Sequence, residues 1–384
     1  MTTAAETETP LLRTPFHKFH LEHNAKMVPF AGWEMPLHYG SIIDEHTQVR
    51  SSGGIFDVSH MGRFSFTGKD ARAFLDRVCT RQIWGMKDGM ARYSFVCNEG
   101  GGCHDDVLVY RVGETDYRMV CNAANREKLV AHFEAVKGDF VFKFEDRTMK
   151  TGMVAVQGPK VMDVIARYDD RIPDLKRYRF LMMNVLGMKV MVARTGYTGE
   201  DGVEIIFPSD TFVAKQAIKM LLKDLSAVEE LAPAGLGARD SLRLEAGMAL
   251  YGHEIDEDLD PVSAGFMFGI KIDKSEDPEK SPEEVGRFIG QDALQRIHRN
   301  GPEQTLVGLE LVGRRAARQG MAVIIDGEPA GKVTSGCLSP TLDKPIAMAY
   351  VRTELAHAGT AVEIDLGRKN AEGVMVKLPF YQAK

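Results

Sequence analysis

Short segments rich in β-branched and aromatic residues come in bunches along this chain, and this pattern constrains the fold more than any other feature. These segments read RFSFTG, DVLVYRV, YRMVCNA, MVAVQG, KVMVART and VEIIFP, and glycine, aspartate or asparagine turns separate them. Apolar residues at every third or fourth position predict amphipathic helices between them, in KDARAFLDRVC, NREKLVAHFEAV, PKVMDVIARY and DTFVAKQAIKMLLKDL. Because strands and helices do not alternate one for one, we predict an α+β fold with antiparallel sheets.

Residues 274–287 form a charged segment, KSEDPEKSPEEVGR, with two prolines and almost no apolar content, which is typical of a linker. A chain of 384 residues is also longer than one ordinary compact core. We therefore predict a first region over residues 12–273, a linker over 274–287 and a C-terminal domain over 288–384. Short strands with glycine or proline turns beyond the linker predict a small β-barrel or sandwich for that domain.

The composition narrows the ligand classes. With a net charge of −6, the chain has no general attraction to nucleic acid or anionic lipid, so a small molecule or a protein partner is favoured. No apolar run approaches the ~20 residues that a membrane span needs. The five cysteines lack CxxC spacing, and the N-terminal segment lacks a basic region followed by an apolar core. We expect a cytoplasmic protein.

The segment NEGGGCHDDVLVYR, residues 98–111, combines a glycine-rich turn with two adjacent aspartates. The glycines predict a hairpin, and four consecutive potential ligands in a strand would alternate between its faces, which argues against a metal site. The same alternation turns Asp105 and Asp106 to opposite faces, one of them into the protein. A carboxylate turned inward beside ARYSF would have the perturbed pKa that acid–base chemistry requires.

The segment ARTGYTGEDGVEI places its glycines in a GxxGxxG spacing, which matches neither the dinucleotide fingerprint nor a phosphate loop. Nucleotide binding is therefore disfavoured, and a long turn between two strands accounts for the glycines. Glu204 stands between Val203 and Ile205 in an apolar strand. A buried carboxylate needs either an arginine or a ligand donor as its partner.

The segment GLGARDSLRLEAGMALYGHEID predicts a helix that begins at its glycines and ends at Gly252. Arg239 and Arg243 lie one turn apart on it, either in ordinary salt bridges or facing an anion. His60 follows an aspartate and a serine in FDVSHMG, but triad members meet through the fold, and no GxSxG elbow is present. These features disfavour a serine hydrolase.

Several ordered motifs together resemble the glycine cleavage T-protein (aminomethyltransferase) family, over about residues 14–380. They are FAGWEMPLHYGSIIDEH, GIFDVSHMG, VCNAANREK, VAVQGP, RTGYTGEDGVEI, GLGARDSLRLEAGMALYG, FIGQDAL and VTSGCLSPTL followed by IAMAYV. The resemblance implies a three-domain cloverleaf around a central folate pocket. Two interleaved α+β subdomains would form residues 12–273, and the last domain would be a β-barrel.

The resemblance also implies the reaction. The aminomethyl group on the lipoyl arm of the H-protein would move to tetrahydrofolate, which would release ammonia and give methylene-tetrahydrofolate. Tetrahydrofolate would be the co-substrate, the lipoylated H-protein the partner, and neither a metal nor a nucleotide would be needed.

Individual residues carry the resemblance into the site. Asp105 falls on the functional aspartate, although Cys103 and His104 replace the usual apolar pair before it. Glu204 falls on the folate-contacting glutamate, where it would accept two hydrogen bonds from the amino-pyrimidine edge of the pterin. Arg239 would complement the carboxylates of the site or the folate. The expected pocket walls are Tyr93, Asn122, Met61 and Tyr197.

Two other functions remain open at this point. The first is another folate-dependent demethylase of the superfamily, which would need no lipoyl protein. The second is a non-catalytic folate-binding protein, but those relatives have a KGCYxGQE pattern, which this chain lacks. The segment TSGCLSP around Cys337 does not match it.

Overall fold

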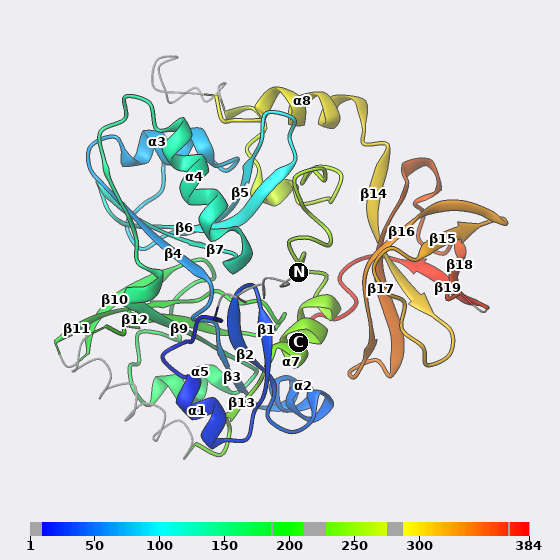
Figure 1. The fold of residues 1–384 in the computed structure, drawn as a ribbon, viewed down its shortest axis with the longest axis horizontal. Helices are drawn as coiled ribbons and strands as arrows, with labels where there is room; N and C mark the ends of the chain where they lie inside the picture. The colour runs from blue at the N-terminus through cyan, green and yellow to red at the C-terminus, as the bar shows by residue number, and fades with distance from the viewer. Residues whose placement is uncertain (1–9, 186, 211–227, 275–286, 368, 384) are drawn as a thin grey trace, which may run out of the picture.

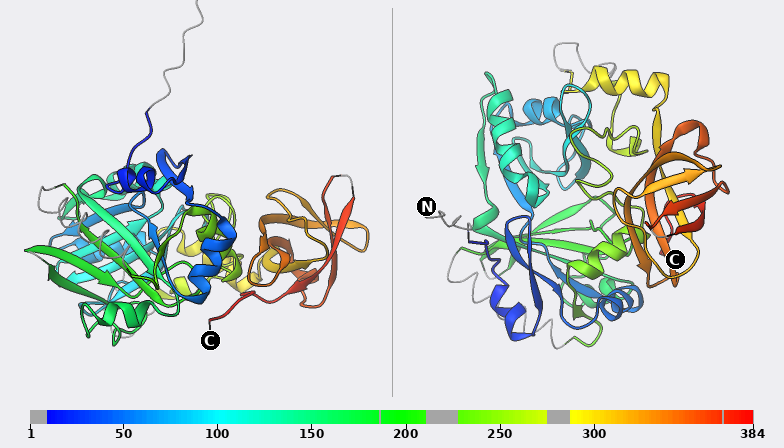
Figure 2. Two further views of the ribbon diagram at one scale, coloured as in Figure 1. Left: turned by 90° about the horizontal axis from the view of Figure 1, so that it is seen from below. Right: turned by 45° about the vertical axis from the view of Figure 1, so that its right-hand side comes forward.

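The computed structural model describes residues 10–383, except for residues 186, 211–227, 275–286 and 368. A body built on two β-sheets is followed by a closed C-terminal barrel, which lies beside the body as a separate lobe (Figures 1 and 2). The predicted α+β fold with antiparallel sheets is confirmed, and the C-terminal strands form a barrel and not a sandwich.

The first sheet has five strands in the order β5-β6-β7-β4-β8. They are β4 (Gly62–Thr67), β5 (Ala91–Cys97), β6 (Cys103–Gly113), β7 (Asp116–Cys121) and β8 (Lys143–Asp146). Two helices, α3 (Ala71–Val78) and α4 (Arg126–Val136), lie on one face of this sheet (Figure 1). Phe74 of α3 and Phe133 of α4 pack there with Val107 and Val109 of β6 in a core that we call the helical-layer core.

The second sheet has six strands in the order β10-β11-β12-β9-β3-β13. They are β3 (Gly54–Asp57), β9 (Thr151–Gln157), β10 (Phe180–Val185), β11 (Met188–Ala193), β12 (Gly202–Pro208) and β13 (Ala232–Pro233). Helix α5 (Val161–Ala166) packs Val161 and Val164 against Val154 and Val156 of β9. Helix α5, which is the next helix after β9 in the chain, therefore covers one face of that strand.

The opposite faces of the two sheets share a third core, which we call the inter-sheet core. The five-stranded sheet contributes Tyr110 and Val120 to it, and the six-stranded sheet contributes Met153, Ala155, Met191 and Ala193. Successive side chains of a strand point to opposite faces, so both sheets bury residues on both of their faces. This arrangement explains why their strands read as nearly continuous apolar segments.

The N-terminal part of the chain packs around this body. It forms α1 (His17–Glu22), the hairpin of β1 (Lys26–Phe30) and β2 (Trp33–His38), and α2 (Ile42–Ser51). Ser41 caps the N-terminus of α2, and its hydroxyl accepts a hydrogen bond from the Asp44 amide. Short 3₁₀ turns form η1 (Ala123–Asn125), η2 (Thr148–Lys150) and η3 (Met267–Gly269).

Helix α7 (Leu236–Glu245) packs against α2, and it is shorter than we predicted. We expected it to continue to Gly252, but it ends at Glu245. Gly247 has a φ of +65°, and its amide bonds to the Leu244 carbonyl, which closes the last turn in the way that helix C-termini often end. The helix predicted from DTFVAKQAIKMLLKDL falls almost wholly outside the described residues.

The barrel has the strand order β14-β17-β16-β15-β18-β19. Its strands are β14 (Gln304–Leu311), β15 (Ala322–Ile325), β16 (Glu328–Ser339), β17 (Lys344–Arg352), β18 (Ala361–Asp365) and β19 (Asn370–Val376), with the turn η5 (Thr353–Leu355) between β17 and β18. Helix α8 (Gln291–Asn300) precedes it and packs Leu294 against Cys97 and Cys103 of the body. The predicted domain limits stay a prediction, and residues 275–286 of the linker lie outside the described part.

Within the described residues, no helix combines the length and the apolar character that crossing a membrane would require.

Candidate active site

Polar side chains gather where the two sheets face each other. Strand β6 turns Leu108 and Tyr110 toward the inter-sheet core, and Asp106 belongs to the same alternating set. On the opposite sheet, Glu204 of β12 pairs in register with Ala155 of β9 and Ala193 of β11, both of which belong to that core. The carboxylates of Asp106 and Glu204 thus belong to facing sheets.

The two adjacent aspartates have different environments. The side chain of Asp105 has no exposed surface, and its carboxylate accepts hydrogen bonds from the Asn122 amide (2.9 Å), Asn122 Nδ2 (2.8 Å) and Asn125 Nδ2 (2.6 Å). Asp106 keeps part of its surface exposed, and it accepts from the Tyr93 hydroxyl (3.0 Å) and from Asn122 Nδ2 (2.7 Å). The side-chain amide of Asn122 therefore donates hydrogen bonds to both carboxylates.

The register of β6 decides which aspartate faces the other sheet. Asp105 pairs with Val96, which belongs to the helical-layer core, whereas Tyr110 pairs with Ala91, which belongs to the inter-sheet core. Asp105 therefore lies on the helical-layer side, next to Asn125 at the start of α4. The expected alternation is present, but Asp106 is the member on the inter-sheet face.

Burial sets the proton affinity of the pair. It raises the pKa of Asp105 well above the ordinary range, and the neighbouring charge of Asp106 adds to that rise while the two asparagines oppose it. Burial also raises the pKa of Asp106, against the hydrogen bonds from Tyr93 and Asn122. Both carboxyl groups therefore hold a proton more readily than an exposed aspartate does, which is a property that acid–base chemistry requires.

The wall opposite the two aspartates holds a carboxylate, Glu204, and a guanidinium, Arg239, whose hydrogen-bonding capacity is not filled. Glu204 is 6% exposed, and among the described residues only Thr195 Oγ1 donates to its carboxylate. Arg239 of α7 holds its guanidinium 4.8 Å from the ring centroid of Tyr197, and its buried Nη1 has no hydrogen-bond partner in the described structure. Buried polar atoms without partners are rare in proteins, so this pair has free capacity for a ligand.

Electrostatic effects connect the two walls. Burial raises the pKa of Glu204, and the charge of Arg239 acts against that rise. Burial raises the pKa of Tyr197 above its usual value, and the charge of Asp106 adds to it. The Tyr197 hydroxyl in turn contributes to the raised pKa of Tyr93, whose main cause is burial. Side chains of both walls therefore lie close enough to affect one another's pKa values.

The remaining predicted wall residues join the same region. Met61 packs against the inter-sheet core, and Tyr93 stacks on the exposed ring of Phe268 at a centroid distance of 5.4 Å. Sequence reasoning missed Asn125 and Thr195, which hold the carboxylates of Asp105 and Glu204. Asn125 lies three residues after Asn122 in CNAAN, and that spacing was the available signal.

The histidine that suggested a triad has no such partners. Asp57 bonds to His20 (2.9 Å) and to the Ser59 amide (2.9 Å), and not to His60. His60 packs its ring edge against Phe30, and burial lowers its pKa to about 3. Among the described residues, the Ser59 hydroxyl donates to the Met153 carbonyl, and no hydrogen bond joins His60 to Ser59 or Asp57, so this segment does not have the geometry of a triad.

The glycine-rich loop before β12 has a packing role. A side-chain carbon at Gly196 would clash with the Gln157 side chain, and one at Gly202 would clash with the Val156 carbonyl oxygen. Both glycines thus let the loop lie directly on β9. The glycines at these two positions are thus explained by close packing, in agreement with a spacing that matches no phosphate loop.

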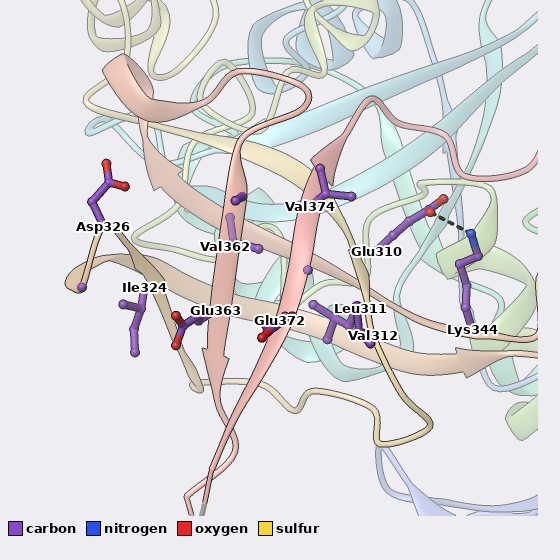
Figure 3. Close-up of a pocket in the computed structure, with 13 residues that line it drawn as sticks. Glu310, Leu311, Val312, Ile324, Asp326, Lys344, Val362, Glu363, Glu372 and Val374 are labelled. Atoms are coloured by element: carbon purple, nitrogen blue, oxygen red, sulfur yellow. Dashed lines mark hydrogen bonds and ion pairs between the residues drawn. The ribbon is translucent and has the colours of Figure 1, made fainter.

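The barrel has a separate depression of 640 Å³ on its surface (Figure 3). Its lining includes the carboxylates of Glu310, Asp326, Glu363 and Glu372, and the cation Lys344, which bonds to Glu310 at 2.9 Å. The side chains of Glu363 and Glu372 lie on neighbouring strands, whereas the aspartate pair and Glu204 belong to the body. We assign the candidate active site to the inter-sheet region.

Among the described residues, no group of three or more histidine, cysteine, aspartate or glutamate side chains has an arrangement that could hold a metal ion. All five cysteines are free thiols, four of them buried.

Two family models match the chain. The first, described as the GCVT N-terminal domain, matches residues 16–274. The second, described as the glycine cleavage T-protein C-terminal barrel domain, matches residues 304–382. The first match contains the candidate active site, and the second contains the barrel.

Curated relatives and a solved structure match nearly the whole chain. An aminomethyltransferase of Rubrobacter xylanophilus is 44% identical over 375 residues, which is 97% of this chain and 95% of that protein. One from Geobacillus kaustophilus is 40% identical, with 97% and 99% covered. The crystal structure of glycine cleavage system aminomethyltransferase T from Bartonella henselae has a TM-score of 0.86 and 31% identity, covering 97% of this chain and 98% of that one.

Proposed function

Because the chain belongs to the glycine cleavage T-protein family, and is therefore an aminomethyltransferase, we propose that its inter-sheet region binds tetrahydrofolate and receives a lipoyl-bound aminomethyl group. The partner would be the lipoylated H-protein of the glycine cleavage system. The supporting observation is that Glu204 and Arg239 lie across from Asp105 and Asp106. Both the carboxylate and the guanidinium have unfilled hydrogen-bonding capacity.

The amino-pyrimidine edge of a pterin fits Glu204. That edge presents two parallel N–H donors, as a guanidinium does, and a carboxylate accepts both in a bidentate arrangement. Thr195 already occupies one lone pair of Glu204 and would hold the carboxylate in position. The unpaired Nη1 of Arg239 would donate to the carbonyl oxygen of the same ring or to another acceptor of the folate.

The proposed transfer balances without an oxidant or a metal. The carbon of the S–CH₂–NH₂ group loses its bonds to sulfur and nitrogen and gains two bonds to folate amines. The two protons that those amines release go to the departing ammonia and to the lipoyl thiol. The carbon passes through iminium character, so a nearby negative charge lowers the barrier.

Asp106 is the residue that we propose for this contact, because it lies on the inter-sheet face and keeps some exposure. It would stabilise the positive charge and carry a proton between the folate amine and the leaving group. Asp105, our sequence-based candidate for the catalytic role, would act through Asn122, which it holds by two hydrogen bonds. Tyr93, Met61 and Tyr197 would form the walls.

Orientation would provide much of the rate. Two large substrates must bring a nitrogen and a carbon into contact, and good alignment of this kind contributes up to ~7–11 kcal/mol. The alternative functions, a folate-dependent demethylase or a non-catalytic folate-binding protein, are not favoured, because the matching relatives are aminomethyltransferases over nearly their full length. We also propose a cytoplasmic location, which the five free thiols support.

The test is ammonia release from aminomethylated H-protein, measured with and without tetrahydrofolate. We expect release to require this protein, the loaded H-protein and tetrahydrofolate together. Tetrahydrofolate binding without ammonia release would instead support a binding protein. One-carbon transfer from a methylated amine, without any lipoyl protein, would support a demethylase.

A further inference from the structure

Arg50, near the end of α2, uses every N–H of its guanidinium. Its side chain is 8% exposed. Nε and Nη2 donate to Glu245 Oε2 at 3.1 and 2.9 Å, and Nη2 also donates to the Leu242 carbonyl at 3.2 Å. Nη1 donates to the Thr198 carbonyl at 2.7 Å and to Glu200 Oε1 at 2.8 Å. These five bonds exhaust the donors of an arginine, so Arg50 has none left for a substrate.

The partners of Arg50 belong to the elements that carry the opposite wall of the site. Thr198 and Glu200 lie in the loop over residues 194–201, which we call the β11–β12 loop. That loop carries Tyr197 and leads into β12 with Glu204. Leu242 and Glu245 belong to α7, the helix that carries Arg239. One side chain therefore ties the loop to the helix.

Glu245 extends the connection to the barrel and the C-terminal segment. It has no exposed surface, and it accepts hydrogen bonds from Ser339 Oγ at the end of β16 and from the Thr341 amide (3.1 Å) and Thr341 Oγ1 (2.8 Å) in the turn that follows. Tyr381 donates its amide to the Glu245 carbonyl at 2.8 Å, and its ring lies 3.9 Å from the Arg50 guanidinium. Arg50 is thus enclosed by three segments that are distant in sequence.

The β11–β12 loop has internal bonds, such as the Arg194–Asp201 ion pair, and it also contacts other elements. It turns at Gly199, which has a φ of +83°, and there it approaches Ala246 just beyond α7. Within the loop, the ring of Tyr197 lies 4.8 Å from the Arg239 guanidinium. The two residues of the loop that Arg50 bonds, Thr198 and Glu200, follow Tyr197 in the chain by one and three positions.

We propose, on the basis of the proposed function, that Arg50 is a positioning residue for the transfer reaction: it holds the β11–β12 loop against α7, and thereby sets the separation of Tyr197, Glu204 and Arg239. Its charge also compensates two buried carboxylates, Glu200 and Glu245. A lysine would keep that charge, but a single ammonium cannot span the loop carbonyl, both carboxylates and the helix carbonyl at once.

Two substitutions test the loop contacts, and one serves as the matched control. Arg50→Lys keeps the charge and removes the planar fork, and Glu200→Gln removes the ion pair on the loop side. Thr341→Ala removes a hydrogen bond to Glu245 on the barrel side and leaves both loop contacts of Arg50 intact. Each variant is first shown to unfold in a single cooperative transition.

The first readout is hydrogen exchange of the backbone amides over residues 194–204. We expect faster exchange there in Arg50→Lys and Glu200→Gln than in the unchanged protein or in Thr341→Ala. Unchanged exchange in Arg50→Lys would overturn the inference, and so would equal acceleration in Thr341→Ala.

The second readout is the affinity for tetrahydrofolate by calorimetry, together with kcat and KM for ammonia release. We expect Arg50→Lys to weaken tetrahydrofolate binding by about tenfold, as misplaced site residues do. The double variant Arg50→Lys/Glu200→Gln should lose little more than either single one, because both act on one connection. Wild-type affinity and kcat in a folded Arg50→Lys protein would contradict the proposal.

The two readouts separate this inference from the proposed function. If the unchanged protein fails to bind tetrahydrofolate, the proposed function is wrong, while faster loop exchange in Arg50→Lys would still show that Arg50 holds the loop. If the unchanged protein transfers the aminomethyl group but neither loop exchange nor affinity responds to Arg50→Lys, only the inference is wrong.

Discussion

The Tyr93 hydroxyl donates a 3.0 Å hydrogen bond to Oδ2 of Asp106. This contact fixes one carboxylate oxygen of Asp106, while Asn122 fixes the other at 2.7 Å. The carboxylate is therefore oriented on the inter-sheet face before any substrate arrives, and such preorganisation is what electrostatic stabilisation of a transition state requires.

Asp106→Asn should lower kcat for ammonia release by about 100-fold or more, because a neutral amide neither carries a proton nor stabilises a developing positive charge. Tetrahydrofolate affinity and the melting temperature should change little. Asp105→Asn should also impair transfer strongly, since its carboxylate orients Asn122, and the fold should largely persist. Steady-state assays of both variants decide the roles. If Asp105→Asn lost all transfer activity while Asp106→Asn kept it, Asp105 and not Asp106 would be the residue that contacts the substrates.

Glu204→Ala should weaken tetrahydrofolate binding by about 10- to 100-fold, which corresponds to the loss of two hydrogen bonds to a charged acceptor. Titration calorimetry measures this directly. Glu310→Gln, which changes an acid in the barrel depression, is the matched control and should bind as the unchanged protein does. An affinity that Glu204→Ala leaves intact would remove its pterin role.

Glu245→Gln should make stability less sensitive to acid. Burial raises the pKa of Glu245, but hydrogen bonds from His46, Ser339 and Thr341 outweigh burial and lower the pKa from 4.5 to about 2. A carboxyl with a depressed folded-state pKa contributes stability above its unfolded pKa, and that contribution is lost as the pH falls through the folded value.

Between pH 4.5 and about 2, the melting temperature of the unchanged protein should therefore fall more steeply than that of Glu245→Gln. Thermal melts at closely spaced pH values measure both slopes. Glu310→Gln should keep the slope of the unchanged protein, and identical slopes in all three proteins would contradict the role of Glu245.

Gly202→Ala should destabilise the fold by about 1–3 kcal/mol, because the added carbon would meet the Val156 carbonyl oxygen of the neighbouring strand. Gly40→Ala is the control: nothing lies within 4 Å of its added carbon, so its stability should stay within about 0.5 kcal/mol. Urea unfolding of both variants gives the comparison. A Gly202→Ala protein as stable as Gly40→Ala would show that β12 can move away from β9.

The sequence was sufficient for the fold class, because the signals for it are local. Alternating β-branched segments with turn glycines require strands, and their bunching requires antiparallel sheets. A glutamate between Val203 and Ile205 also identified a buried carboxylate without the structure, because an acid in an apolar strand must find a partner. The end of α7 was not predictable from its apolar spacing, since the left-handed Gly247 stops the helix while apolar residues continue.

Asp105 and Asp106 could be placed on opposite faces of one strand without any coordinates, since side chains alternate along any strand. Which face meets the second sheet and which meets α4 became known from the packing of the folded chain. That choice depends on how the five-stranded sheet packs against its neighbours, and both faces of β6 are apolar, so no local pattern distinguishes them. No local pattern predicts the role of Arg50 either. Its partners lie about 150 to 195 positions away in the sequence, and they meet it only when the β11–β12 loop and α7 pack against α2.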